Sequence, residues 1–455
     1  MLYSQTWAFA WDEGFHLLAA QLILKGMRPY IDFFHAQTPL YAYWNALWMR
    51  IFGDTWRTAH AVSAVCTTIA LWLVGTYALD RFNWRANWRL PLAFATVLLT
   101  GLNSQVVQFA TIGQGYAICL LAVVASFRLA VAEYAFGAGF FAGVAAASSL
   151  LTAPMGPVLF VWMMLAPGPK WKRALLFIAG GLIPFLPLLR LFLQSPKVVF
   201  FGAVKFHLFY RTVDWSESGK QNVDVALGWL ESPHAMLAGL LVLLGLIFLA
   251  RNEIPMSLRR ELRLCIWLSI VEGAYLLYVR PTFGRYYLFI VPFVSIISAI
   301  GLYYAGTHIG RPDKPRWIML MVTLLMCLGV GRTLNGGKGD YRWKDWEKIA
   351  KKVNEVTRPD GIVYGDEAVY FITKRTPPSG MEYEDTHKLR LSKELSAELH
   401  IFSKEEVLRR IKAGTYDTVA TCEDEDRVKE ETLPDLYKQK TTIGDCAVYW
   451  DKDKR

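Results

Sequence analysis

Long apolar segments alternate with short polar loops up to about residue 335. A membrane-spanning helix needs about 20 largely apolar residues, and somewhat fewer where neighbouring helices shield it. The pattern therefore predicts ten spans. They cover roughly 56–80, 90–104, 112–132, 137–153, 154–168, 174–194, 234–250, 264–279, 286–306 and 317–334. Pro154 and Pro157 interrupt the fourth and fifth, which form two helices, one broken helix or a re-entrant hairpin.

The chain becomes polar after residue 335, and its pattern there predicts a small α/β domain. Helix-like patterns cover 343–356 and 404–413, and runs typical of strands cover 362–364, 418–421 and 447–450. We therefore expect an α-helical polytopic membrane protein in three parts. Residues 1–55 form a loop with interfacial helices, 56–334 the transmembrane helical domain, and 335–455 the α/β domain.

Composition and charge support a membrane protein. Of the 455 residues 54% are hydrophobic, and the mean hydropathy is +0.26. Residues 336–455 carry 23 Lys and Arg against 25 Asp and Glu, whereas the preceding part carries 26 against 14. The excess positive charge lies in loops between apolar segments, which is typical of membrane topology. We expect a lipid bilayer as a partner and no nucleic acid.

The basic loops set the orientation, because Lys and Arg gather on the cytoplasmic side. Four loops on one side of the predicted spans carry them: Arg81, Arg85 and Arg89; Lys170, Lys172 and Arg173; Arg251, Arg259, Arg260 and Arg263; Arg311, Lys314 and Arg316. The opposite side then holds 1–55, 195–233, 280–285 and the whole tail. This arrangement predicts a multi-pass protein of the cytoplasmic membrane with an extracytoplasmic C-terminal domain.

The N-terminus has no evident way to reach the outer side. Met1–Ala10 is too short to span a bilayer. We therefore expect a further N-terminal helix in the natural protein. Cys422 and Cys446 lie in the polar tail and could pair if that tail is extracytoplasmic; the sequence leaves their pairing open.

Two adjacent acids are the strongest candidates for chemistry. Asp12 and Glu13 begin a predicted helix that Gly26 ends, with an apolar face made by Phe15, Leu18, Ala19, Leu22 and Ile23. The simpler interpretation is an N-cap and a favourable first-turn charge. However, acids at a membrane boundary are costly unless they are used or paired. The aromatic-rich stretch 40–52, ending at Gly53, predicts an interfacial helix close behind them.

These residues carry a resemblance to a known family. Trp11-Asp12-Glu13-Gly14, Arg28-Pro29-Tyr30-Ile31-Asp32-Phe33-Phe34-His35 and Thr38-Pro39-Leu40 resemble the first extracytoplasmic loop of the C-type (GT-C fold) glycosyltransferases, which include the protein mannosyltransferases and the lipid A aminoarabinose transferase. Many spans, Arg285-Tyr286-Tyr287 with Pro292 opening a late span, and a C-terminal extracytoplasmic domain extend the resemblance. In that family one helix precedes the acidic loop.

The resemblance implies transfer of a sugar from a polyprenyl-phosphate donor to a lipid, glycan or protein acceptor, with inversion at the anomeric carbon. Asp12 matches the acidic motif and would be the general base, while Glu13 would orient the acceptor or tune Asp12. Relatives often place another charged residue in the next outer loop, where this chain has Gln108, Thr111 and Gln114. We therefore expect metal-independent catalysis and no cofactor.

Further candidates would bind the donor or the acceptor. They are Asp32 and His35 in the first loop, Lys205, His207, Tyr210 and Arg211 in the next long outer loop, Glu272 within a span, and Arg280, Arg285 and Tyr286 in a late outer loop. Cations at the outer surface suit a donor phosphate. Simpler roles are contact with lipid headgroups for the arginines, anchoring at the interface for Tyr286, and pairing of Glu272 with an arginine.

Three other functions remain open on the sequence. An oligosaccharide transferase or polymerase would use a lipid-diphosphate donor. A lipid or glycan transporter would show paired charges in mid-membrane and two similar halves, whereas the acids here cluster outside the core. The third alternative is a non-catalytic protein that binds a glycan and transfers no sugar.

Overall fold

The computed structural model describes residues 1–9, 12–84, 86–211, 218–231, 233–251, 253–309, 316–336, 342–422 and 433–452. Trp11 of the acidic motif and the loop residues Arg85, Arg311 and Lys314 lie outside these ranges. The chain forms two compact units. Unit 1 contains Met1, 61–187 and 215–339, and unit 2 contains 2–60, 188–214 and 340–455.

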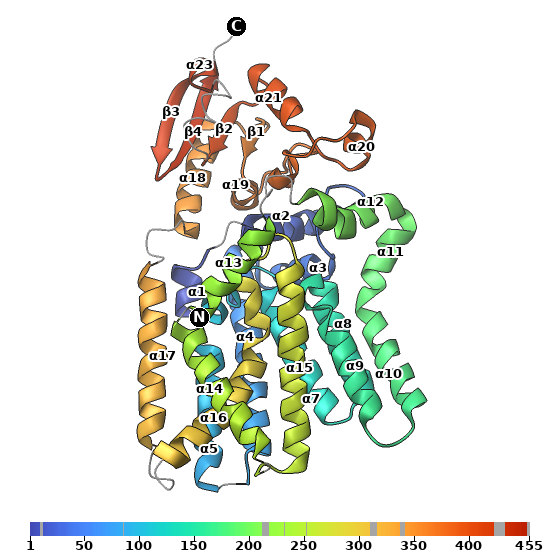
Figure 1. Ribbon diagram of the computed structural model, residues 1–455. Helices are drawn as coiled ribbons and strands as arrows, with labels where there is room; N and C mark the ends of the chain where they lie inside the picture. The colour runs from blue at the N-terminus through green and yellow to red at the C-terminus, as the bar shows by residue number, and fades with distance from the viewer. Residues whose placement is uncertain are drawn as a thin grey trace. The chain divides into compact units, whose positions relative to one another are not determined.

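Unit 1 is built from apolar helices (Figure 1). They are α4 (Trp56–Arg81), α5 (Ala86–Gly101), α6 (Ser104–Phe109), α7 (Tyr116–Val131), α8 (Ala135–Ser148), η1 (Leu150–Thr152), α9 (Met155–Leu165), α10 (Lys170–Leu182), η2 (Ile183–Phe185), α13 (Ser218–Leu230), α14 (Pro233–Ala250), α15 (Met256–Tyr278), η4 (Gly284–Phe289), α16 (Val291–Ile309) and α17 (Arg316–Gly336), with the first turn of α4 in unit 2. Each of the ten predicted spans corresponds to one of these helices or to the run from α10 into α11 (Leu186–Gln194).

Four helical segments of the described chain are long and apolar enough to cross a membrane: Trp56–Arg81, Lys170–Gln194, Val291–His308 and Trp317–Asn335. A bent pair, Lys220–Leu230 with Ala235–Ala250, makes a fifth if it counts as one span. The segment around Pro154 and Pro157 forms the two separate helices α8 and α9, and Pro157 lies inside the first turn of α9. A proline there costs little, because the first-turn N–H groups have no partner within the helix.

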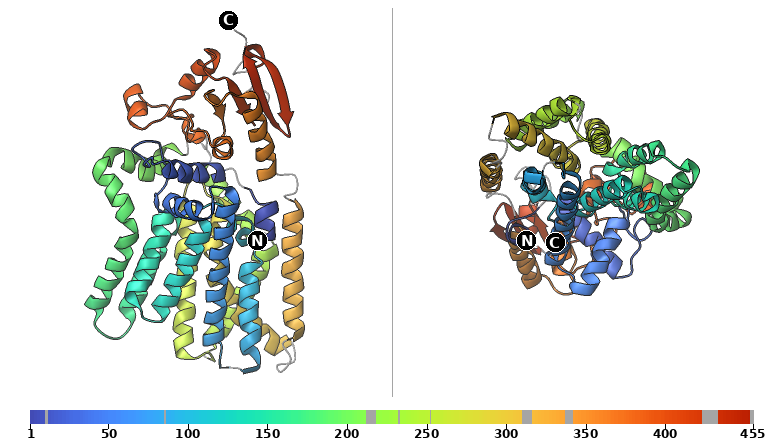
Figure 2. Two further views of the ribbon diagram at one scale, coloured as in Figure 1. Left: turned by 180° about the vertical axis from the view of Figure 1, so that it is seen from behind. Right: turned by 90° about the horizontal axis from the view of Figure 1, so that it is seen from below.

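Small residues bring α8 close to α10. α8 packs between α7 and α10, as Figure 1 and the view from behind in Figure 2 show. A Cβ at Gly139 or Gly143 would overlap the backbone of α10. Glycines four residues apart on one helix face allow this close approach, which supplies the van der Waals contact that holds apolar helices together in lipid.

Unit 2 joins the N-terminal loop to the polar tail. Its elements are α1 (Leu2–Thr6), α2 (Asp12–Leu24), α3 (Leu40–Phe52), α12 (Pro196–Phe200), η3 (Phe201–Tyr210), α18 (Trp343–Val356), β1 (Val363–Gly365), α19 (Glu367–Thr373), η6 (Glu384–Thr386), α20 (Lys393–Glu398), α21 (Lys404–Lys412), β2 (Thr418–Thr421), α23 (Leu433–Leu436), β3 (Tyr437–Ile443) and β4 (Cys446–Lys452), with most of α11 also in unit 2. The predicted helices at 12–26, 40–52, 343–356 and 404–413 are confirmed.

The sheet has the strand order β1-β2-β4-β3. β1 and β2 are parallel, whereas β4 runs antiparallel to both β2 and β3. α18 packs across three of the strands and buries Trp343, Trp346, Ile349 and Val353 on one face. Each such side chain contributes about 1.5–3 kcal/mol on burial. A Cys422–Cys446 disulfide ties the segment after β2 to β4 and resolves the pairing that the sequence left open.

Candidate functional site

Helices α2 and α19 run side by side in the same direction within unit 2. Near their N-terminal ends, a Cβ at Gly14 would lie 2.8 Å from the backbone nitrogen of Ala368, so only glycine permits this approach. Farther along, Gln21 Nε2 donates to the Phe371 carbonyl at 3.0 Å. Since the contacts follow the same order along both helices, the two N-termini lie at one end, where partial positive charge favours carboxylates.

Glu13 is fully buried and its carboxylate is held by protein partners. Trp343 Nε1 of α18 donates to Glu13 Oε2 at 3.1 Å, and His60 Nε2 bonds Glu13 Oε1. His60 is therefore a hydrogen-bonding residue of the protein interior. The Trp56 and Trp343 rings stack 5.6 Å apart beside this network. Glu13 thus fixes the start of α2 against α4 and α18.

Asp12, in contrast, is only half-buried. It lies near Tyr383, whose ring packs 4.2 Å from that of Phe15 on the next turn of α2. Burial raises the pKa of Tyr383, and the negative charges of Asp385 and Asp12 raise it further, while Arg211 opposes them. The structure thus brings two of the predicted site residues, Asp12 and Arg211, into one electrostatic environment around Tyr383.

A second acidic group begins α19. Asp366, Glu367 and Glu384 each offer an oxygen within 4.8 Å of the others, a spacing that could hold a divalent cation. Asp366 caps α19 by accepting from the Ala368 N–H at 2.7 Å, and the Glu384 N–H donates to Glu367 Oε1 at 2.7 Å. Burial raises the pKa of both Asp366 and Glu367, and the neighbouring acids add to it. Metal-independent catalysis therefore stays a prediction.

Sequence reasoning missed this group, although one signal was present. Asp366-Glu367 opens α19 as Asp12-Glu13 opens α2, and in each case a small residue follows. Tyr383 carried no such signal, because more than 300 residues separate it from Asp12 along the chain.

Two first-loop candidates have partners that fold the loop. Arg28 donates to Asp32 through its side chain at 2.9 Å and through its backbone N–H at 2.7 Å, and these bonds lower the pKa of Asp32. Burial lowers the pKa of His35 to about 3, so this imidazole is neutral at physiological pH. Asp32 therefore stabilises the turn 28–33, and His35 packs inside the loop.

The candidates on η3 lie along one π-helix. His207 Nε2 donates to the Ala36 carbonyl and ties η3 to the first loop. Tyr210 packs against Phe201, with ring centroids 5.0 Å apart. Lys205 is exposed, and its Nζ lies 5.8 Å from the Phe200 ring centroid. Lys205 is thus the candidate on η3 with the most freedom to meet a ligand.

Four candidates lie in unit 1. Arg285 Nε donates to the Tyr116 hydroxyl at 3.0 Å, and its guanidinium lies 4.4 Å from the Phe283 ring centroid. Tyr286 is buried beside it, and Arg280 is exposed after α15. Glu272 is fully buried on α15, and neither of its oxygens has a hydrogen-bond partner in the part of the chain that is described. Among the described residues no arginine pairs with Glu272, contrary to the simpler role considered for it.

Comparison with known proteins identifies the fold. The sequence matches no family model and no curated protein. The structure is similar to ArnT from Cupriavidus metallidurans bound to undecaprenyl phosphate, with a TM-score of 0.71 and 15% identity over 98% of this chain and 94% of that one. The same enzyme in the apo state gives a TM-score of 0.67 and 13% identity over the same shares.

The predicted resemblance is thus confirmed at the level of the fold: the chain has a GT-C fold similar to that of ArnT, with a small mixed sheet near its C-terminus. The apolar helices and this fold together indicate a multi-pass membrane protein.

Proposed function

We propose that this protein is a membrane glycosyltransferase that transfers a sugar from a polyprenyl-phosphate donor to an acceptor at the outer face of the cytoplasmic membrane. The observation that carries the proposal is the fold similarity, over 98% of the chain, to ArnT bound to undecaprenyl phosphate. The Cys422–Cys446 disulfide supports an extracytoplasmic tail, because disulfides persist in oxidising compartments.

Asp12 is the general base in this proposal. An acceptor hydroxyl attacks the anomeric carbon, the bond from that carbon to the donor phosphate breaks, and polyprenyl phosphate leaves with the electron pair. Asp12 takes the hydroxyl proton, and attack opposite the phosphate inverts the anomeric centre. Asp12 suits this role better than Glu13, because it is half-buried whereas the Glu13 carboxylate is enclosed by His60 and Trp343.

The positively charged candidates suit the donor phosphate. Arg285 is positioned by the Tyr116 hydroxyl and the Phe283 ring, and Arg280 is exposed in the same outer loop. A guanidinium offers paired N–H donors in a geometry that matches phosphate oxygens. On unit 2, the positively charged candidates are Lys205 and Arg211.

The test is sugar transfer in membranes that contain the full-length protein. Radiolabelled undecaprenyl-phosphate sugars are supplied with delipidated cell envelope as a mixed acceptor. We expect labelled product with the native protein and with Asp345→Asn, since Asp345 is a first-turn acid of α18, as Asp12 is of α2. Asp12→Asn should form labelled product about 100-fold more slowly, or more slowly still. Label arising only from diphosphate-linked donors would overturn the monophosphate donor and favour the oligosaccharide transferase.

A further inference from the structure

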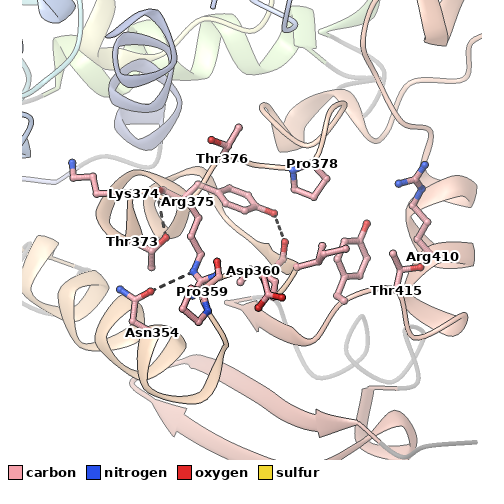
Figure 3. A pocket seen from close by; sticks show the side chains of 15 residues that line it. Asn354, Pro359, Asp360, Thr373, Lys374, Arg375, Thr376, Pro378, Arg410 and Thr415 are labelled. Carbon is pink, nitrogen blue, oxygen red and sulfur yellow. Dashed lines mark hydrogen bonds between the residues drawn. The ribbon is translucent and has the colours of Figure 1, made fainter. Parts of the chain in front are cut away.

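The C-terminal part of unit 2 contains a cavity with mixed polar and apolar walls that the proposed chemistry does not use. Its volume is about 670 Å³, within the range of roughly 300–1,000 Å³ common for small-molecule sites. This cavity is open to solvent and is lined by the end of α18, the loop before β1, the end of α19 and the end of α21 (Figure 3). Asn354 and Arg375 lie on one side of the cavity, and Arg410 and Thr415 lie on the other.

The cations of the cavity are already neutralised. Arg375 donates to the carbonyls of Thr357, Arg358 and Gly361 at 3.0–3.2 Å, where the C-terminal end of α18 carries partial negative charge. Lys374 pairs with a carboxylate outside the cavity, that of Asp54, at 3.0 Å, and Arg410 likewise pairs with Glu406 at 2.7 Å. A phosphate or an acidic peptide would therefore meet little uncompensated positive charge.

Polar groups that carry no positive charge remain available instead. In the described part of the chain, no protein group bonds the Asp360 carboxylate or the Thr415 hydroxyl. The Asn354 amide uses its oxygen to accept from Arg375 Nε and leaves its NH₂ for a ligand. Carboxylate, hydroxyl and amide groups around one cavity suit a ligand rich in hydroxyls, which both donates and accepts hydrogen bonds at close spacing.

The position of the cavity relative to Asp12 is set by α2. At the far end of that helix, Lys25 Nζ donates at 3.0 Å to the Lys374 carbonyl and at 3.0 Å to the Thr376 hydroxyl, both in residues that line the cavity. Asp12 and Lys25 are thirteen residues apart on α2 and its continuation, so Lys25, whose side chain contacts the wall of the cavity, lies about 20 Å from Asp12 at about 1.5 Å per residue. This is the length of several sugar residues.

We infer that the cavity binds a neutral oligosaccharide segment of the acceptor, several sugar residues away from the hydroxyl that Asp12 deprotonates. The acceptor is then a growing glycan. The part of this inference that concerns turnover rests on the proposed function, whereas binding in the cavity does not.

The test measures binding first, without donor. Purified full-length protein in nanodiscs is titrated with mannohexaose, arabinohexaose, galactohexaose and maltohexaose, and saturation-transfer NMR and native mass spectrometry report binding. At least one should bind. Asp360→Asn and Thr415→Val should each weaken that binding by roughly five- to ten-fold, because each weakens or removes a group that is free to bond the ligand. The control is Arg409→Ala, since Arg409 also pairs with Glu406 but does not line the cavity.

The outcomes separate this inference from the proposed function. If a hexaose binds through the cavity but no polyprenyl-phosphate sugar is transferred, the cavity assignment stands and the proposed function fails. If transfer occurs but no hexaose binds, or an acidic peptide library binds instead, the inference is wrong. In transfer assays Asp360→Asn should raise KM for long acceptors and leave kcat unchanged, whereas a purely structural defect would lower kcat for acceptors of every length.

Discussion

Replacing Glu13 by alanine should destabilise unit 2 strongly. The change removes the acceptor of the 3.1 Å bond from Trp343 Nε1 and the bond to His60 Nε2. Trp343 is 1% exposed and His60 0%, so water does not replace the carboxylate. Two buried groups without partners cost about 1–3 kcal/mol each, which gives a loss of about 4 kcal/mol. Since unit 2 has roughly 200 residues, Tm should fall by about 10 °C.

Glu13→Gln separates a structural role from a chemical one. The amide keeps an acceptor oxygen for Trp343, so the loss should be only about 1–2 kcal/mol. Thermal unfolding of the purified protein in detergent, followed by tryptophan fluorescence, measures both variants. Glu355→Ala is the control, because Glu355 is an exposed acid of α18 with a 3.9 Å ion pair. A Glu13→Ala protein that melts within 2 °C of the parent, where about 10 °C is expected, would refute the reasoning.

Three further predictions concern unit 2, and the first has its control on α9 of unit 1. Gly14→Ala should cost about 1–3 kcal/mol through overlap with α19, whereas Gly156→Ala, whose Cβ meets nothing within 4 Å, should be neutral or slightly stabilising in the same melting assay. Reduction of the Cys422–Cys446 disulfide, or its replacement by two serines, should cost about 3 kcal/mol, seen as a lower Tm; an unchanged Tm under reductant would contradict the bond's contribution. Burial raises the pKa of Glu382 from 4.5 to about 7, so its contribution to stability is full below pH 4.5 and is lost as pH rises to 7, by up to about 3 kcal/mol. Glu382→Gln should remove this loss, and parallel pH–Tm curves for variant and parent would refute it.

Local patterns predicted the helices of the N-terminal loop. The acids at 12–13 mark the start of α2, and Gly26 follows its end. Gly53 ends α3 with a positive φ of 104°. These signals act within one turn of chain, so the sequence alone contains them. The predicted apolar face of α2 was too narrow, because every residue from Glu13 to Leu22 is buried.

Long-range contacts were beyond the sequence. Strand β3 was not predicted, because most of its residues after Tyr437 are polar and exposed, and only pairing with β4 makes it a strand. Trp343, which bonds Glu13, and Tyr383, which lies near Asp12, are each more than 300 residues away along the chain. These contacts form only when the chain packs in three dimensions. The periodicity of the first loop therefore does not predict them.

The most direct test of the general-base role compares donor binding with turnover in Asp12→Asn. The purified protein is titrated with undecaprenyl phosphate, and single-turnover transfer from an undecaprenyl-phosphate sugar is timed. We predict an unchanged Kd and a rate reduced about 100-fold or more, since a positioned base contributes about 100- to 10,000-fold. Transfer by Asp12→Asn at the native rate would contradict the account.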